Sequence, residues 1–202
     1  MRFSQEIALL GLTLAAASLC TAGPVTYDVA QAIGPGSVSG FIETDGTTGI
    51  LSSVNIVDWN LLLNDGISTT FDLLGPLSGS NSQLAYIGSG LSATPNQLLF
   101  DFGGGGYAIF QHPYFGSGID LICYEGSDPN QGCAGGPEDI SGEILNVNFP
   151  NRFRSQSGVQ VIGTAAAPEP STLILLGAGI ALIGFRKLIS SPASKTPPAL
   201  LR

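Results

Sequence analysis

The sequence predicts an all-β fold, either an antiparallel β-sandwich (jelly-roll-like) or a barrel, with an N-terminal signal-peptide helix and one C-terminal transmembrane helix. Interior segments alternate apolar and polar residues with the period of two typical of strands. These segments are short, turn residues separate them, and no interior stretch sustains a helical period. We divide the 202 residues into a signal peptide (1–22), an extracytoplasmic β domain (23–163), a C-terminal signal segment with the transmembrane helix (164–187) and a short Ser/Pro-rich tail (188–202).

The N-terminus has the pattern of a secretory signal peptide. Arg2 precedes an apolar run over residues 7–19. Three small residues follow this run and predict signal cleavage between Ala22 and Gly23. A retained membrane anchor and a lipoprotein anchor are the alternatives.

A hairpin is predicted near the middle of the β domain. Residues 58–63 and 67–74 both alternate as half-buried strands do, and Asn64-Asp65-Gly66 between them is a turn sequence. Asp45-Gly46 and Gly75-Pro76 punctuate the chain in the same way. Further strands are expected at 25–31, 37–43, 83–88, 119–124, 143–149 and 158–163.

A second hairpin is predicted around a run of four glycines. Residues 98–102 and 107–111 read as strands, and the glycines at 103–106 allow the positive φ angles that a tight reversal needs. No lysine follows these glycines, so they predict a turn and not a phosphate-binding loop.

Cys123 and Cys133 are predicted to form a disulfide. They are the two cysteines left after removal of the signal peptide, and turn-forming residues fill the segment between them. An exported protein folds in an oxidising compartment, which favours pairing over the alternative of free thiols. A zinc site is not expected, because two cysteines and the distant His112 do not supply four ligands.

The β domain is strongly acidic. Residues 23–167 contain thirteen acidic and two basic residues, a net charge of −11. Such a surface repels nucleic acid, so no nucleic-acid partner is expected. The charge serves solubility or attracts cations. No cofactor is predicted, but a loop calcium site of oxygen ligands is an alternative, with these candidate residues: Asp128, Glu138, Asp139 and Glu143.

Motifs for catalysis are missing from the sequence. There is no Gly-x-Ser-x-Gly, no His-Glu-x-x-His and no Gly-x-x-x-x-Gly-Lys. His112 is the only histidine, so a Ser-His-Asp triad would have to use it with Asp101 or Asp120, and nothing selects a serine. We predict a non-enzymatic protein, with a secreted hydrolase that uses paired carboxylates as a less favoured alternative.

Aromatic residues gather around the second predicted hairpin. They include Tyr107, Phe110, Tyr114 and Phe115. If Tyr114 and Phe115 are exposed, their rings can stack on a polysaccharide, so they are candidate glycan contacts. A carbohydrate-binding module for extracellular polysaccharide is therefore the alternative function, and core packing of the aromatic residues is the other interpretation.

Residues 172–185 form an uncharged apolar run near the C-terminus. As a helix this run is about 21 Å long at ~1.5 Å per residue. A bilayer core is about 30 Å thick, so the span depends on flanking residues and on snorkelling of Arg186 and Lys187. The basic pair favours a cytoplasmic flank, which places the β domain outside the cytoplasm. A buried core helix is the alternative.

This segment resembles the PEP-CTERM sorting signal of Gram-negative bacteria. The resemblance rests on Pro168-Glu169-Pro170-Ser171-Thr172, the apolar run and the basic pair, and the matching motif residues are Pro168, Glu169, Pro170, Arg186 and Lys187. It implies recognition by an exosortase, transient anchoring in the inner membrane and export to the cell envelope or extracellular matrix, with exopolysaccharide as a further candidate partner. Such signals usually stop at the basic residues, whereas this chain continues through residues 188–202.

Three segments of the β domain also resemble uncharacterised exported proteins that carry the same tail: 40–47, 58–61 and 91–95. Those proteins imply no activity. The sequence thus predicts a non-enzymatic exported envelope or exopolysaccharide-matrix protein, and it does not name the molecular activity of the β domain.

Overall fold

Apolar residues at every second position bury one face of many strands. In β4 (Ile56–Asn64), for example, Trp59, Leu61 and Leu63 are buried, whereas Leu62 is 40% exposed. The computed structural model describes residues 23–113, 120–127, 133, 141–148 and 151–165. The other strands in these residues are β1 (Val25–Ile33), β2 (Gly36–Thr44), β3 (Gly49–Ile50), β5 (Thr70–Leu74), β6 (Gln83–Gly88), β7 (Leu91–Ala93), β8 (Gln97–Asp101), β9 (Gly106–His112), β10 (Asp120–Glu125), β11 (Gly142–Asn146), β12 (Arg152–Ser155) and β13 (Val159–Ala165), and a 3-10 helix, η2, spans Ser53–Asn55.

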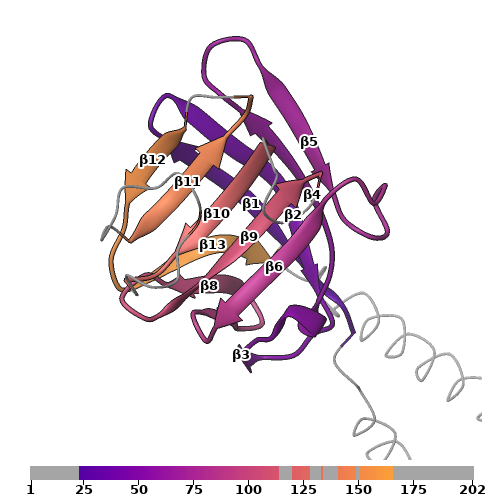
Figure 1. Ribbon diagram of the computed structural model, residues 1–202. Coiled ribbons are helices and arrows are strands. Elements are labelled where there is room, and N and C mark those ends of the chain that lie inside the picture. The colour runs from indigo at the N-terminus through magenta and orange to yellow at the C-terminus, as the bar shows by residue number, and fades with distance from the viewer. Residues whose placement is uncertain (1–22, 114–119, 128–132, 134–140, 149–150, 166–202) are drawn as a thin grey trace, which may run out of the picture. The chain divides into compact units, whose positions relative to one another are not determined.

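The strands form two antiparallel sheets that pack face to face (Figure 1). The larger sheet has eight strands in the order β3-β7-β8-β13-β1-β2-β4-β5. The smaller sheet has five strands in the order β12-β11-β10-β9-β6. The all-β prediction is confirmed, and two separate sheets with their own edge strands agree with the sandwich and not with the barrel. The jelly-roll connectivity stays a prediction.

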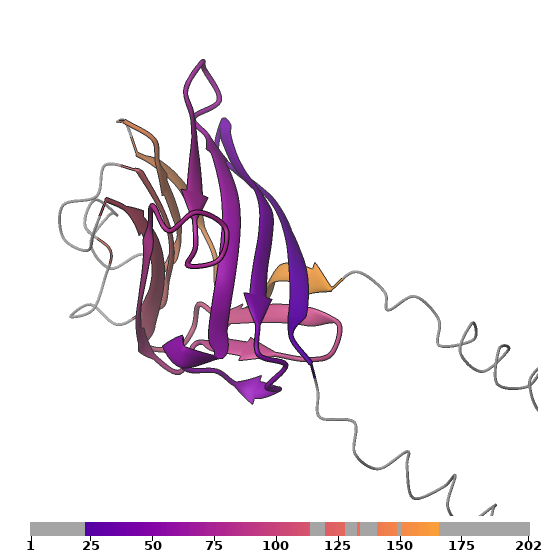
Figure 2. The same ribbon diagram turned by 90° about the vertical axis from the view of Figure 1, so that its right-hand side faces the viewer.

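The larger sheet bends at β13. This strand pairs with β1 at two positions, Tyr27↔Ala165 and Asp28↔Thr164, and its register with β8 shifts between Val161 and Gly163. A bulge of this kind bends its strand and increases the local twist. In Figure 2 the rose-coloured β8 accordingly lies across the base of the view, whereas the indigo and violet β1, β2 and β4 stand upright.

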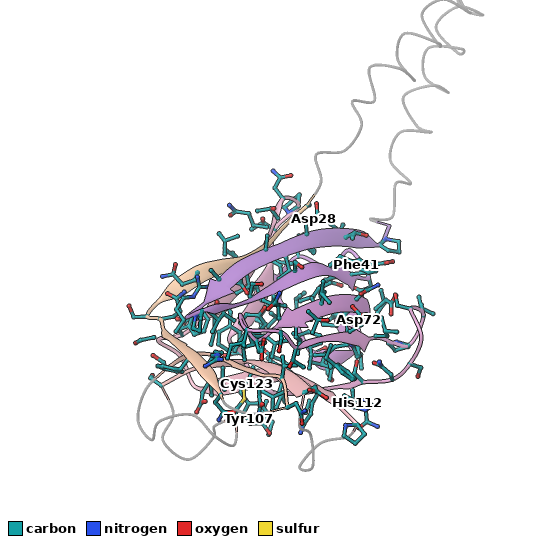
Figure 3. All side chains as sticks on the ribbon, turned by 90° about the horizontal axis from the view of Figure 1, so that it is seen from above. Asp28, Phe41, Asp72, Tyr107, His112 and Cys123 are labelled. Atoms are coloured by element: carbon teal, nitrogen blue, oxygen red, sulfur yellow. A yellow bond between two sulfur atoms is a disulfide. The ribbon has the colours of Figure 1, made fainter. Side chains whose placement is uncertain are left out.

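The core lies between the two sheets. Tyr27 and Phe100 from the larger sheet and Phe110 and Tyr124 from the smaller sheet are all at most 1% exposed. Figure 3 shows Asp28, Phe41 and Asp72 along the larger sheet and Tyr107, His112 and Cys123 along the smaller one, with a dense layer of side chains between the sheets. Burial of this apolar surface is the main favourable term in the stability of the fold.

The first predicted hairpin exists, but its second strand starts later than expected. β4 and β5 pair from Asn64↔Thr70 onward, so residues 65–69 form the connection. Asp65 Oδ1 accepts hydrogen bonds from the backbone N–H groups of Ile67, Ser68 and Thr69 at 2.8, 3.0 and 3.0 Å. These bonds hold the backbone in a loop, which is why the alternating pattern from residue 67 did not become strand.

The second predicted hairpin is wrong. β8 pairs with β7 and β13 in the larger sheet, whereas β9 pairs with β6 and β10 in the smaller sheet. The glycines at 103–106 therefore carry the chain from one sheet to the other. The pattern of alternation identified both strands, but it contains no information about their partners.

Several short elements were not predicted. β3, β7, β12 and η2 have only two to four residues each, too few to show a period. β11 also ends at Asn146, earlier than the expected range of 143–149. Each remaining predicted strand overlaps an observed one.

Candidate functional site

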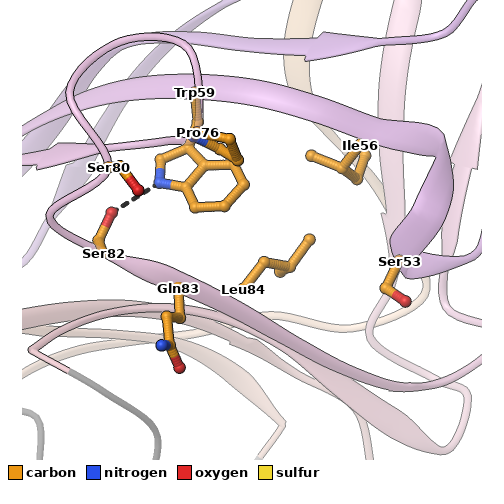
Figure 4. A pocket seen from close by; sticks show the side chains of 8 residues that line it. All are labelled: Ser53, Ile56, Trp59, Pro76, Ser80, Ser82, Gln83 and Leu84. Atoms are coloured by element: carbon orange, nitrogen blue, oxygen red, sulfur yellow. Dashed lines mark hydrogen bonds between the residues drawn. The ribbon is translucent and has the colours of Figure 1, made fainter.

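A depression opens between η2, β4 and the start of β6 (Figure 4). Its volume is about 400 Å³. Its floor is formed by buried residues, and exposed residues surround its mouth. The eight residues that line it are Ser53, Ile56, Trp59, Pro76, Ser80, Ser82, Gln83 and Leu84. A concave site with mixed apolar and polar lining is the usual form of a small-ligand pocket.

Trp59 is fixed at the floor of this depression. Its ring packs edge-on against Phe110, with ring centres 5.3 Å apart and an interplanar angle of 68°. The indole Nε1 donates a 2.8 Å hydrogen bond to Ser82 Oγ, and Ser82 Oγ donates in turn to the Leu74 carbonyl at 2.9 Å. Trp59 is 4% exposed, so packing and hydrogen bonding together hold the indole in one orientation.

The loop between β5 and β6 forms one wall and is tied down by its own backbone. The Gly75 carbonyl accepts hydrogen bonds from the N–H groups of Ser78, Gly79 and Ser80, at 3.2, 3.2 and 2.7 Å. Ser80 has a φ of 54°, an uncommon value for a residue with a side chain. Asn81 Oδ1 accepts from Leu74 N–H at 2.7 Å, which closes the base of the loop.

Asp58 anchors the same loop from β4. Its carboxylate accepts hydrogen bonds from Leu77 N–H at 3.0 Å, from Ser78 N–H at 3.3 Å and from Ser78 Oγ at 2.6 Å. Burial by itself raises the pKa of Asp58, but the hydrogen bonds from Ser78, Leu77 and the Trp59 backbone outweigh burial and lower that pKa. Asp58 is therefore an ionised anchor at neutral pH.

His112 also holds the loop, and its hydrogen bond there goes to a backbone carbonyl and not to a serine hydroxyl. Its Nδ1 lies 2.6 Å from the Asn81 carbonyl, so this nitrogen carries the proton. The ring packs against Phe71 at 4.8 Å, and His112 faces Asp120 across the β9–β10 pairing. Burial raises the pKa of Asp120, against the hydrogen bond from Asn148 N–H and the charge of His112. The second candidate acid, Asp101, accepts from Gly103 N–H instead.

The predicted disulfide between Cys123 and Cys133 is present, with 6.4 Å between the two Cα atoms. It belongs to a second hydrophobic cluster on the smaller sheet, which also contains Tyr107, Ile109, Leu121 and Ile144. Ligand-type atoms of both cysteines and Glu125 lie within 4.8 Å of one another. The two sulfur atoms are bonded to each other, so the disulfide is a covalent cross-link that stabilises this cluster. Burial raises the pKa of Glu125, and a hydrogen bond from the Cys133 backbone opposes the rise.

A buried polar network connects the two sheets on the side of β12. Glu143, which is 0% exposed, pairs with Arg154 at 2.5 Å and accepts from Gln31 Nε2 at 3.0 Å. The hydroxyl of Tyr124 donates to Gln31 Oε1 at 3.0 Å. Burial and the charge of Glu143 raise the pKa of Tyr124, and the charge of Arg154 lowers it. This network places Glu143, one of the four calcium candidates, between the sheets. Asp128, Glu138 and Asp139 lie outside the described residues.

The aromatic residues near β9 divide in two groups. Tyr107 and Phe110 are 7% and 1% exposed, which confirms the core-packing interpretation for these two rings. The candidate glycan contacts Tyr114 and Phe115 lie outside the described residues. The same is true of the signal peptide with Ala22, the apolar run 172–185 and all five sorting-motif residues; Gly23 is the first described residue.

Comparison with known protein families gives a match near the C-terminus. Residues 166–187 match the family described as the PEP-CTERM protein-sorting motif. The chain carries a PEP-CTERM sorting motif. The predicted motif residues Pro168, Glu169, Pro170, Arg186 and Lys187 all fall within the match. No curated protein and no solved structure matches the chain, so the resemblance of the β domain to other exported proteins stays a prediction.

The PEP-CTERM motif indicates an exported protein with an exosortase-type sorting signal and processing at a membrane anchor. In the part of the chain that the structure describes, no helix combines the length and the apolar composition needed to cross a bilayer.

Sequence reasoning missed the depression around Trp59. The available signals were the single tryptophan beside an acid in an alternating strand, and the Gly/Ser/Asn-rich segment 75–82. Neither signal shows that this segment folds back over the indole, because that contact joins Trp59 to Ser82, 23 residues further along the chain.

Proposed function

We propose that the protein is a non-enzymatic component of the cell envelope or exopolysaccharide matrix of a Gram-negative bacterium, delivered there through an exosortase. The observation that carries the proposal is the PEP-CTERM motif at residues 166–187, which follows a disulfide-bonded β domain. In this proposal the signal peptide directs the chain across the inner membrane, and the apolar run 172–185 holds it there until exosortase acts.

The negative charge of the β domain supports the proposal of export, as its disulfide does. Arg152 and Arg154 are the only basic residues between positions 23 and 167. Arg152 Nε donates to the Asp65 carbonyl at 3.0 Å, and Arg154 pairs with Glu143. Both cations thus bind groups of the domain itself, and the domain presents an acidic surface that favours solubility outside the cell.

Deletion of residues 168–187 tests the sorting proposal. We expect the full-length chain to fractionate with the membrane and to appear at the cell surface, and the deleted chain to be released without membrane association. Deletion of residues 188–202, which lie beyond the matched motif, is the matched control and should preserve both properties. Unchanged membrane association and surface display after removal of 168–187 would refute the proposal.

Carbohydrate binding by the β domain is a second candidate function. The observation that favours it is the depression at Trp59, whose lining combines apolar side chains with serine hydroxyl groups. Retention of the exported protein on immobilised polysaccharides tests it. Retention by at least one polysaccharide is the expected result, and failure to bind any of a broad panel would contradict this second function while leaving the sorting proposal intact.

A further inference from the structure

We infer that the depression at Trp59 is a binding subsite for one uncharged saccharide ring. This inference rests on the second proposed function, carbohydrate binding, and assigns a place and a ligand class to it. A saccharide ring has C–H groups on its faces and hydroxyl groups around its edge. It therefore needs an apolar surface next to hydrogen-bonding groups.

The depression provides both kinds of group, with apolar side chains at its bottom and polar side chains at its mouth. Ile56 and Trp59 lie buried at the bottom, and the half-buried Leu84 adds to this apolar floor. Ser53 and Ser80 are exposed around the mouth, where their hydroxyl groups can meet the edge of the ring, whereas the Gln83 side chain points away from the depression (Figure 4). The volume of about 400 Å³ falls within the usual range of roughly 300–1,000 Å³ for small-ligand sites.

The charge around the depression selects an uncharged ligand. None of its eight lining residues is ionisable. The nearest described carboxylate along the chain is Asp58, which stays ionised and accepts three hydrogen bonds from the loop wall. With a net charge of −11 on the domain, a sugar acid would meet repulsion without any cation in the lining to offset it.

The walls of the depression are held in place by contacts inside the protein. Asp58 and His112 bind the β5–β6 loop from two different sheets, and Ser82 fixes the indole. A ligand therefore does not have to order this loop on binding, which reduces the entropy cost of association. Because Trp59 is only 4% exposed, the ring of the sugar meets the edge of the indole and the neighbouring apolar side chains.

The fluorescence of Trp59 provides a direct test, because it is the only tryptophan in the chain. The full-length protein is purified in a detergent without a sugar headgroup and titrated with neutral oligosaccharides. Oligosaccharides of uronic acids with the same number of rings form the comparison. We expect a saturable change in Trp59 emission with at least one neutral oligosaccharide and a much weaker response to its acidic counterpart.

Two substitutions remove the edge contacts without removing the floor. Ser53→Ala deletes one hydroxyl, and Ser80→Gly deletes the other while it suits the positive φ at position 80. Loss of two hydrogen bonds to the ligand should weaken binding by about tenfold or more. Ser39→Ala is the matched control, because Ser39 is also an exposed serine but does not line the depression.

The outcomes separate the site from the function. Weaker binding in the Ser53→Ala/Ser80→Gly variant, with binding by the Ser39→Ala variant unchanged, supports the inference. Retention on polysaccharide that persists in the double variant and leaves Trp59 emission unchanged would overturn the inference and keep carbohydrate binding elsewhere on the domain. Tyr114→Ala and Phe115→Ala then test the other candidate contacts. A lack of binding to all neutral oligosaccharides and polysaccharides would overturn both the site and the second function.

Discussion

Buried acidic side chains in this domain each have a defined set of hydrogen-bond donors. Asp58 accepts from the β5–β6 loop, Asp65 accepts from three consecutive backbone N–H groups, and Glu143 accepts from Arg154 and Gln31. A buried carboxylate without such partners would destabilise the fold severely. Asp58 thus holds the loop beside the depression, Asp65 shapes the β4–β5 loop, and Glu143 joins the two sheets.

Asp58→Asn should destabilise the protein by about 1–3 kcal/mol at neutral pH, because the amide cannot replace both carboxylate oxygens as acceptors for Ser78 and Leu77. Since the pKa of Asp58 is lowered in the folded state, its contribution is present at neutral pH and is lost as the pH falls below about 3.9, the value in the unfolded chain. Urea unfolding at neutral pH and at acidic pH, followed by Trp59 emission, measures both effects.

The control for this substitution is Asp72→Asn, which changes an exposed acid on the neighbouring strand β5. We expect little change in the free energy of unfolding for this control. An Asp58→Asn protein as stable as the Asp72→Asn protein at neutral pH would show that the carboxylate does not anchor the loop.

Arg154→Met should destabilise the protein by about 3–5 kcal/mol, because it leaves the fully buried Glu143 without its cation. The double variant Glu143→Gln/Arg154→Met removes both charges and should recover much of this loss. Chemical unfolding of the two variants gives the comparison. Equal stability of the single and double variants would contradict a role for charge pairing here.

At the scale of the elements, the decisive feature is the pairing of each strand. β8 and β9 are neighbours in sequence but belong to different sheets. The glycines between them allow the chain to pass from one sheet to the other. The last of them, Gly106, lies close to the edge strand β6. Gly106 has a φ of 108°, and a Cβ atom there would lie 2.1 Å from the Ile87 carbonyl oxygen.

Gly106→Ala should therefore destabilise the domain by about 2 kcal/mol or more, through backbone strain and the clash with β6. Gly103→Ala is the matched control, because a Cβ there would lie 3.3 Å from Asp101 Oδ1 and 3.6 Å from the Gly158 backbone, and no left-handed backbone is required. Thermal unfolding of both variants tests the difference. Similar midpoints for the two would mean that the close approach of β9 to β6 is not important for stability.

At the scale of the whole molecule, three features fit a protein that folds in an oxidising compartment after export. They are the disulfide, the acidic surface and the PEP-CTERM motif. The Cys123–Cys133 bridge staples the outer cluster of the smaller sheet. The bridge can form only where thiols are oxidised. The PEP-CTERM motif indicates export independently of the cysteines.

A chain made without residues 1–22 should stay in the cytoplasm with Cys123 and Cys133 reduced. The exported chain should begin at Gly23 and lack free thiols. We expect the reduced form to be less stable by about 2–3 kcal/mol, the chain-entropy value for a short loop. Intact mass, thiol titration and thermal unfolding measure these properties. An exported Cys123→Ser/Cys133→Ser chain should match the reduced form, and equal stability of the oxidised and reduced forms would contradict the staple.

Features that depend on neighbouring residues were predictable. The strands such as β1, β2 and β6 followed from local alternation, the disulfide followed from two cysteines around a turn-rich segment, and the sorting motif followed from adjacent residues at 168–187. The loop after Asn64 was predicted as a turn, but the predicted turn was too short. Hydrogen bonds to the Asp65 side chain keep residues 67–69 in the loop as well.

The sequence by itself determined most of the strands, the disulfide and the sorting motif of this protein. The tertiary structure alone decided that β8 and β9 lie in separate sheets, that Glu143 is paired with Arg154 between the sheets and that Ser82 holds Trp59 at the floor of a depression. The physical reason is the separation along the chain of the residues that each kind of interaction joins. Alternation, turn chemistry and motifs act over a few residues, whereas pairing and burial join groups that are distant in the chain and become neighbours only when the whole core packs.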